Sequence, residues 1–133
     1  MKKDSPHYII VDTCSLLRRE GQKFVRLNAE RQDCSILLPR MVYQELSRFV
    51  WQKKKLRYCA LNALARLRAA CIQPMERSGK FAVADDEIVN YCRFPNKAPQ
   101  YVCTEDKKLR QRIAEVNPAV QLMTASQLHH IMA

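Results

Sequence analysis

The sequence predicts an α/β fold built around a mostly parallel sheet. Short apolar runs that suit buried strands alternate along the chain with longer segments of helical periodicity. Two of these runs end abruptly in polar clusters, as strands do at the ligand-binding edge of an open α/β sheet. The chain has 133 residues, which fits a single domain spanning residues 1–133 with one core.

The first expected strand is the apolar run at residues 8–11, which stops at Asp12. An apolar run bounded by polar residues suits a strand that is buried on both faces. Asp12 then lies at the carboxyl end of that strand. Ser15 is expected to cap the next helix, which runs through Leu27 and is interrupted or kinked near Gly21.

A second strand is expected at residues 35–38, and Pro39 opens the helix that follows it. Apolar residues at intervals of four and three form one buried face of this helix, and Glu45 lies at the boundary of that face. Residues 51–70 are expected to form one long or broken basic amphipathic helix. Residues 71–75 suit a short strand, which their proline limits to an edge or an end of the sheet.

The second half of the chain continues the alternation. A helix is expected within residues 81–94, where three consecutive acidic residues suit the positive end of the helix dipole. Residues 100–104 form a buried strand that again ends in a polar cluster. A helix at residues 107–116, a last strand at residues 120–123 and a terminal helix capped by Thr124 complete the chain.

The composition indicates what kind of partner the protein binds and in which cellular compartment it works. The net charge of +10 and the pI near 9.6 favour a polyanionic partner such as nucleic acid. The six cysteines form no CxxC pair, so we expect reduced core thiols instead of a zinc site or a disulfide scaffold. We expect a cytoplasmic protein without a membrane segment, because no signal core or long apolar stretch occurs.

Acidic residues fall where the expected strand ends and helix edges face one crevice. The positions are Asp12, Glu45, Asp85 or Asp86, and Asp106. Without one acid from each position, 9 acidic residues remain against 23 basic ones, which leaves +14. A basic shell attracts a nucleic-acid backbone, and carboxylates are hard ligands for Mg²⁺ or Mn²⁺. Taken singly, each acid also suits a helix cap or a solvated helix position.

Four segments together carry a resemblance to a known family. Residues 9–13, residues 39–46 with Glu45, residues 85–88 and residues 104–106 resemble, in order and spacing, the motifs of the PIN-domain family of metal-dependent nucleases. The resemblance covers most of the chain. It implies a three-layer α/β/α sandwich, a Mg²⁺ or Mn²⁺ cofactor, and endonucleolytic cleavage of single-stranded or structured RNA.

The resemblance also implies roles for individual residues. Asp12, Asp85 and Asp106 would bind the metal, and Glu45 would complete the catalytic cluster directly or through water. Two acidic doublets, Asp85-Asp86 and Glu105-Asp106, leave open which member of each pair is the ligand. Metal binding would relieve the mutual repulsion of these acids. Hydroxyl groups that would orient the carboxylates or the scissile phosphate belong to Thr13, Ser15 and Thr104.

A basic run and two aromatic residues are the candidates for RNA contact. The basic residues are Lys53, Lys54, Lys55 and Arg57. Their alternative is a solvated helix face. Trp51 and Tyr58 could stack on bases, but packing inside the protein is the favoured interpretation.

Several biological settings stay open for such a nuclease. It suits the toxin of a toxin–antitoxin pair, bound by an antitoxin or another protein partner, or an enzyme of RNA maturation, decay or defence; a homodimer is also compatible. The alternative class is a non-catalytic RNA-binding or scaffold domain with the same fold. A Rossmann-type phosphatase or nucleotide-binding domain is disfavoured, because the only two glycines form no phosphate loop.

Overall fold

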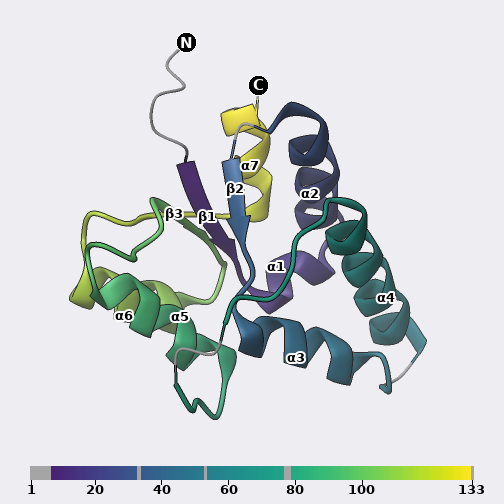
Figure 1. Ribbon diagram of the computed structural model, residues 1–133, viewed down its shortest axis with the longest axis horizontal. Coiled ribbons are helices and arrows are strands. Elements are labelled where there is room, and N and C mark those ends of the chain that lie inside the picture. The colour runs from purple at the N-terminus through teal and green to yellow at the C-terminus, as the bar shows by residue number, and fades with distance from the viewer. Residues whose placement is uncertain (1–6, 33, 53, 77–78, 133) are drawn as a thin grey trace.

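The computed structural model describes residues 7–32, 34–52, 54–76 and 79–132 of the chain, and Figure 1 shows its α/β architecture. Its sheet has four parallel strands in the order β2-β1-β3-β4. The strands are β1 (His7–Val11), β2 (Cys34–Leu37), β3 (Tyr101–Cys103) and β4 (Gln121–Met123). The predicted parallel sheet is therefore confirmed, with β1 and β3 as its two inner strands.

Helices lie to both sides of the sheet (Figure 1). In the described residues they are α1 (Thr13–Leu17), α2 (Arg19–Arg31), α3 (Arg40–Phe49), α4 (Lys54–Ala69), α5 (Ala84–Arg93), α6 (Lys107–Val116) and α7 (Ala125–Met132). Helices α5 and α6 pack against each other, and α2 packs against both α7 and α4. This arrangement is compatible with a three-layer α/β/α fold.

The core explains why the inner strands read as continuous apolar runs. Ile9, Ile10 and Val11 of β1 are buried, and so are Val102 and Cys103 of β3. Successive residues of a strand point to opposite faces, so burial of consecutive residues means that both faces are covered by helices. Largest among the other buried side chains are Phe24, Leu16, Leu46, Ile88, Leu109, Ile113 and Leu128, which all come from helices.

The first helical region differs from the prediction in its cap and in its break. Asp12 caps α1, since its side chain accepts a hydrogen bond from the Ser15 backbone N–H. The helix ends at Leu17, Arg18 has an extended backbone, and α2 begins at Arg19. Gly21 is a buried residue inside α2, where an added Cβ would lie 1.9 Å from the Ser15 carbonyl oxygen. The glycine allows α2 to pack closely on α1.

The strand predicted at residues 71–75 is reduced to one isolated bridge. Leu38 pairs with Pro74 in parallel, and the Met75 N–H donates to the Leu38 carbonyl over 2.8 Å. Cys71 has a left-handed backbone with φ 59°, which turns the chain at the end of α4. Pro74 has no N–H to continue a ladder, so the pairing stops there.

Two expectations about burial are wrong in part. Cys34, Cys92 and Cys103 are buried as expected, but Cys14 and Cys71 are exposed. Trp51 is 82% exposed and Tyr58 is 63% exposed, so neither packs inside the protein. In the part of the chain that the structure covers, no helix is both long and apolar enough to cross a membrane.

Candidate active site

Asp12 and Asp106 lie at the same edge of the sheet. Their strands, β1 and β3, are parallel neighbours with Val11 paired to Cys103, and the Asp12 N–H donates to the Cys103 carbonyl over 3.0 Å. Each aspartate caps a helix: Asp12 Oδ1 accepts from the Ser15 N–H at 2.8 Å, and Asp106 Oδ1 accepts from the first turn of α6. These backbone bonds hold one oxygen of each carboxylate in place, and among the described residues no hydrogen bond is made to the other oxygen.

Glu45 joins three parts of the fold at this edge. It lies on α3, at the boundary of its buried face as predicted. Its Oε1 accepts a hydrogen bond from the Thr13 hydroxyl at 2.7 Å, and its Oε2 accepts from the Ala84 N–H at 3.2 Å. Glu45 therefore connects the first residue of α1 to the first residue of α5. Asp85 comes directly after Ala84.

Asp85 interacts electrostatically with the other acids. Burial raises the pKa of Asp85 most, followed by the negative charges of Asp106, Asp12 and Glu45, whereas Arg112 lowers it. Partial burial and the same four carboxylates raise the pKa of the Cys14 thiol on α1. Carboxylates influence each other's pKa in this way only when they are close together. The four acids predicted from sequence thus come together at one edge of the sheet.

In each of the two acidic doublets, one member forms an ion pair within the described part of the chain and the other does not. Asp86 pairs with Arg112 at 3.0 Å, and Glu105 pairs with Arg18 at 3.3 Å. The neighbours Asp85 and Asp106 instead belong to the acidic cluster. The sequence left Asp85 and Asp86 as alternatives; the Asp86 carboxylate pairs with a guanidinium, whereas Asp85 interacts with the other three acids of the cluster.

The three predicted hydroxyl groups have different partners. Thr13 donates to Glu45, as described above, and the Thr104 Oγ1 accepts from the Asp106 N–H at 3.1 Å. Both therefore help to position an acid. Ser15 contacts Asp12 through its backbone N–H, while its hydroxyl bonds the Cys103 thiol, whose pKa burial raises to about 12. The Ser15 hydroxyl is thus directed at the core and not at the carboxylates.

Glu87 is a buried acid whose contact the sequence did not reveal. From sequence it is first-turn charge on α5, but its side chain is only 1% exposed and accepts a hydrogen bond from the Met41 N–H at 2.8 Å. The carboxylate thus satisfies a free N–H in the first turn of α3. Its position three residues after Ala84 and four before Tyr91 was the available signal, because that spacing places it on the buried face.

Replacing Glu87 by alanine is expected to lower the free energy of unfolding by about 2 kcal/mol, because the Met41 N–H loses its charged acceptor and a buried cavity remains. Glu87→Gln keeps an acceptor oxygen and should cost about half as much. Urea unfolding of both variants measures the effect. Equal stability of Glu87→Ala and the wild type would show that this contact does not hold α3 in place.

The pKa of Asp85 gives a prediction for pH dependence. A raised pKa means that the folded protein binds the proton of the Asp85 carboxyl group more tightly than the unfolded chain does. Ionisation of Asp85 therefore lowers the free energy of unfolding as the pH rises above 3.8, the ordinary pKa of this group. Asp85→Asn is therefore expected to increase the free energy of unfolding near pH 7 in a chelator. The increase should disappear at about pH 3, where both states carry the proton. Urea unfolding at the two pH values tests this, and an increase that is equal at both would contradict it.

Comparison with protein families and with curated proteins gives no guide to this site. The chain matches no protein-family model. A comparison with curated proteins finds no significant relative. The acidic cluster must therefore be interpreted from its own geometry and charge.

The donor atoms of the cluster fit a hard divalent cation better than a soft one. Carboxylate oxygens are the ligands that Mg²⁺ and Mn²⁺ prefer. Among the described residues, no three histidine, cysteine, aspartate or glutamate side chains are already arranged to hold a metal ion. Carboxylates repel each other, and a cation that binds among them relieves this repulsion. The chemistry of the donors fits such an ion.

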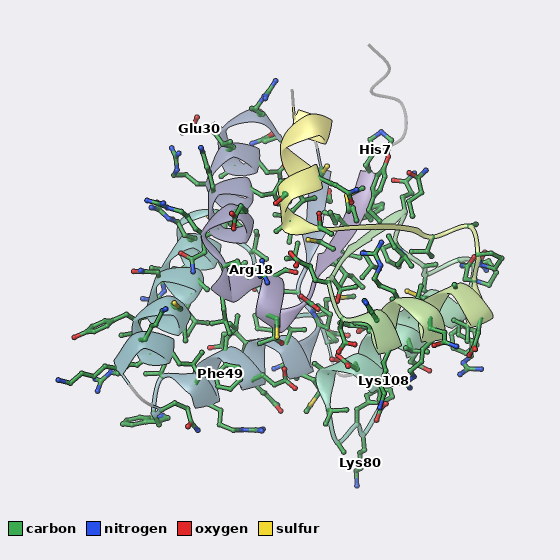
Figure 2. All side chains as sticks on the ribbon, turned by 180° about the vertical axis from the view of Figure 1, so that it is seen from behind. His7, Arg18, Glu30, Phe49, Lys80 and Lys108 are labelled. Atoms are coloured by element: carbon green, nitrogen blue, oxygen red, sulfur yellow. The ribbon has the colours of Figure 1, made fainter. Side chains whose placement is uncertain are left out.

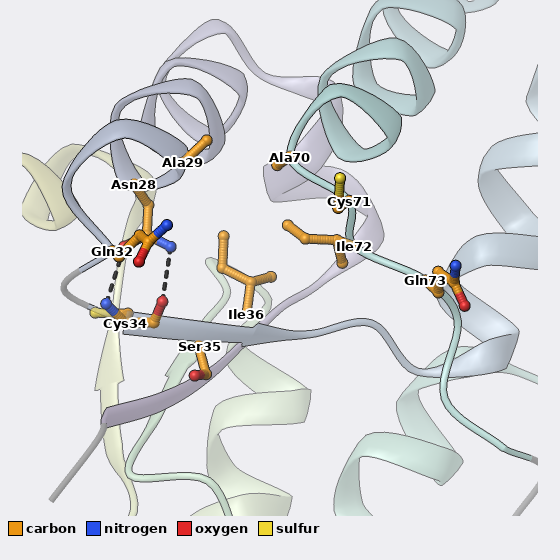
Figure 3. Close-up of a pocket in the computed structure, with 10 residues that line it drawn as sticks. All are labelled: Asn28, Ala29, Gln32, Cys34, Ser35, Ile36, Ala70, Cys71, Ile72 and Gln73. Carbon is orange, nitrogen blue, oxygen red and sulfur yellow. Dashed lines mark hydrogen bonds between the residues drawn. The ribbon is translucent and has the colours of Figure 1, made fainter.

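The predicted RNA-contact residues and a cavity beside β2 lie elsewhere in the fold. Lys54, Lys55 and Arg57 are exposed on α4, and Lys53 lies outside the described residues. Figure 3 shows a cavity of about 310 Å³ beside the outer edge of β2, between α2 and the segment after α4. There the Asn28 side chain makes two hydrogen bonds to the Cys34 backbone and covers that end of the strand edge. None of the four acids lines this cavity.

Proposed function

We propose that this protein is a Mg²⁺- or Mn²⁺-dependent endoribonuclease of the PIN type that hydrolyses RNA phosphodiester bonds. The observation that carries the proposal is the electrostatic coupling of Asp85 with Asp12, Glu45 and Asp106, four acids from separate elements. A protein with a net charge of +10 concentrates these acids at one edge of its sheet. Such a cluster costs stability, so a chemical role for it is the simplest reason for its presence.

The contacts of each acid in the cluster suggest its role in the proposed reaction. Asp12, Asp85 and Asp106 would hold the cation, and Glu45 would complete the cluster. When bound, the cation supplies a water of lowered pKa and neutralises charge that develops on the phosphate. Backbone N–H groups at the starts of α1 and α6 keep Asp12 and Asp106 oriented. Thr13 does the same for Glu45 through its hydroxyl.

Arginines at the rim of the cluster suit the approach of a phosphate. Arg112 lies close enough to Asp85 to lower its pKa, and Arg18 pairs with Glu105 beside Asp106. Their side chains are 45% and 55% exposed, so both guanidinium groups remain accessible from solvent. Guanidinium groups bind phosphate oxygens in a forked geometry, so these residues would guide the RNA backbone towards the acids.

A cleavage assay on a panel of single-stranded and structured RNAs tests the proposal. Cleavage is expected with Mg²⁺ or Mn²⁺ and is expected to stop when a chelator removes the cation. Cleavage that persists in the chelator would show that another activity, or a contaminating nuclease, is responsible. Growth arrest on expression, relieved by a co-expressed partner protein, would favour an antitoxin-controlled toxin over an enzyme of RNA maturation or decay.

A non-catalytic RNA-binding or scaffold domain is the second candidate. It is favoured by the finding that, in the described part of the chain, no acidic side chains already form a metal-binding group. The basic residues of α4 would then serve binding alone. This candidate predicts RNA binding of the same strength with and without divalent cations, and no cleavage in either case.

A further inference from the structure

The α3–α4 region has a strongly one-sided charge. Residues 46–75 contain seven lysines and arginines and no aspartate or glutamate. The basic residues of this stretch are Arg48, Lys53, Lys54, Lys55, Arg57, Arg66 and Arg68. Charge of one sign over such a long stretch has no acid within the segment to neutralise it, so it attracts anions from solution.

Large apolar side chains are exposed in the same region. Trp51 follows α3 and is 82% exposed, and Tyr58, on the second turn of α4, is 63% exposed. Leu61 is 41% exposed. Lys54, Tyr58 and Leu61 are separated by four and three residues, so they lie on one face of α4. We call the exposed side chains of Trp51, Lys54, Arg57, Tyr58 and Leu61 the hairpin face.

The hairpin face does not stabilise the fold by burial. An indole that is 82% exposed contributes little of the free energy that a buried aromatic side chain provides. Helices α3 and α4 pack against each other (Figure 1), and the buried core residues that they contribute include Leu46, Ala63 and Leu67, none of which belongs to the hairpin face. Exposed aromatic residues of this size are typical of surfaces that bind a partner.

Charge selects the class of partner. A second copy of this chain would bring two acid-free basic segments together, which like-charge repulsion opposes. A polyanion is attracted to this segment instead, because basic side chains release counterions from its phosphates when they bind. The aromatic rings among these basic residues further favour a single-stranded nucleic acid, since rings stack on the flat faces of unpaired bases. A base pair inside a duplex does not offer these faces.

We infer that the hairpin face binds single-stranded RNA, with Trp51 and Tyr58 stacking on unpaired bases and Lys54 and Arg57 contacting the phosphates. This inference rests on the proposed function only in its statement that the bound strand continues to the acids. Helix α3 ends at Phe49 (Figure 2), four residues and about 6 Å along the helix axis after Glu45, and Trp51 follows Phe49 by two residues. A strand held at Trp51 would lie close enough to reach the acidic cluster.

The chain contains a single tryptophan, so the test can use its fluorescence. Asp12→Asn protein in a chelator, which cannot cleave, is titrated with a single-stranded oligoribonucleotide. We expect saturable quenching of the Trp51 emission, as stacking on an indole produces. Tyr58→Ala is expected to weaken binding about ten-fold. Phe94→Ala, which removes a 48% exposed ring at the end of α5, is the matched control and should bind as tightly as the parent.

Two further variants separate stacking from charge. Trp51→Ala, followed by fluorescence anisotropy of labelled RNA, should also weaken binding about ten-fold with little change in salt dependence. Lys54→Ala should reduce the slope of log K against log salt by about 0.7, the value for one phosphate contact on a single strand. Circular dichroism checks that each variant is folded, which the exposure of these side chains favours.

Other outcomes would overturn the inference. Equal quenching by inorganic polyphosphate would show attraction by charge without stacking, and equal affinity for duplex RNA would remove the role of unpaired bases. A blue shift of Trp51 emission with anionic phospholipid vesicles, but no response to RNA, would assign the face to a membrane surface. Cleavage of RNA without any Trp51 quenching would reject this inference alone, whereas quenching without metal-dependent cleavage would reject only the nuclease.

Discussion

Replacing Asp12 by asparagine is expected to lower metal-dependent RNA cleavage on the order of a thousand-fold. The substitution removes one negative charge from the cluster of Asp12, Glu45, Asp85 and Asp106. A cation that neutralises developing charge contributes several kcal/mol to transition-state stabilisation, and each 1.36 kcal/mol is about a factor of ten in rate. The measurement is the initial rate of cleavage of one RNA at saturating Mg²⁺ or Mn²⁺.

The choice of asparagine keeps the structural role of this residue. Asp12 caps α1 by accepting the Ser15 N–H, and asparagine is as good a cap as aspartate. The fold and the RNA binding should therefore persist in the variant. Loss of activity together with loss of folding would leave the result without meaning for catalysis, so urea unfolding of the variant accompanies the assay.

Glu105 provides the matched control for an acid outside the cluster. Glu105 is next to Asp106 in sequence but pairs with Arg18 at 3.3 Å. Asp106→Asn should lower cleavage as strongly as Asp12→Asn, whereas Glu105→Gln should change it by a few-fold at most, as expected for a partly exposed ion pair. A large loss in Glu105→Gln and none in Asp106→Asn would mean that the two neighbours have been assigned the wrong way round.

Gly21→Ala is expected to lower the free energy of unfolding by about 3 kcal/mol. The added Cβ would lie 1.9 Å from the Ser15 carbonyl oxygen, which is backbone and cannot rotate away. Helices α1 and α2 would have to move apart. Because α1 carries Thr13, whose hydroxyl holds Glu45, the same change should also reduce cleavage. Urea unfolding measures the first effect, and the cleavage rate measures the second.

The other glycine of the chain is the control for this substitution. A Cβ on Gly79 would meet only the ring edge of Phe81, at 3.2 and 3.3 Å, and Gly79 is exposed. Its backbone is not in the left-handed region, so Gly79→Ala should change stability by less than about 1 kcal/mol. Comparable losses in the two variants would show that the α1–α2 contact is more adaptable than the structure indicates.

Most of the fold could be predicted because its elements are local. The buried run of β1 and the helix over residues 107–116 follow from apolar periodicity and from capping residues near in sequence. The interruption expected near Gly21 is present, but it lies three residues earlier, at Arg18. The single bridge at Pro74 could not be predicted, since it depends on Leu38 in a distant segment. Gly21 looked like a helix interruption, yet the carbonyl of Ser15 explains why a glycine is needed there.

The sequence by itself determined which acids end the strands, because an apolar run followed by a carboxylate is a local pattern. Only the tertiary structure decided which member of each doublet joins the cluster. Among the described residues, Asp86 and Glu105 differ from their neighbours in forming ion pairs with arginines from other parts of the chain, Arg112 and Arg18. The exposure of Trp51 was decided in the same way. Composition and spacing give the residues available for a site, but long-range packing sets which of them face each other, the core or the solvent.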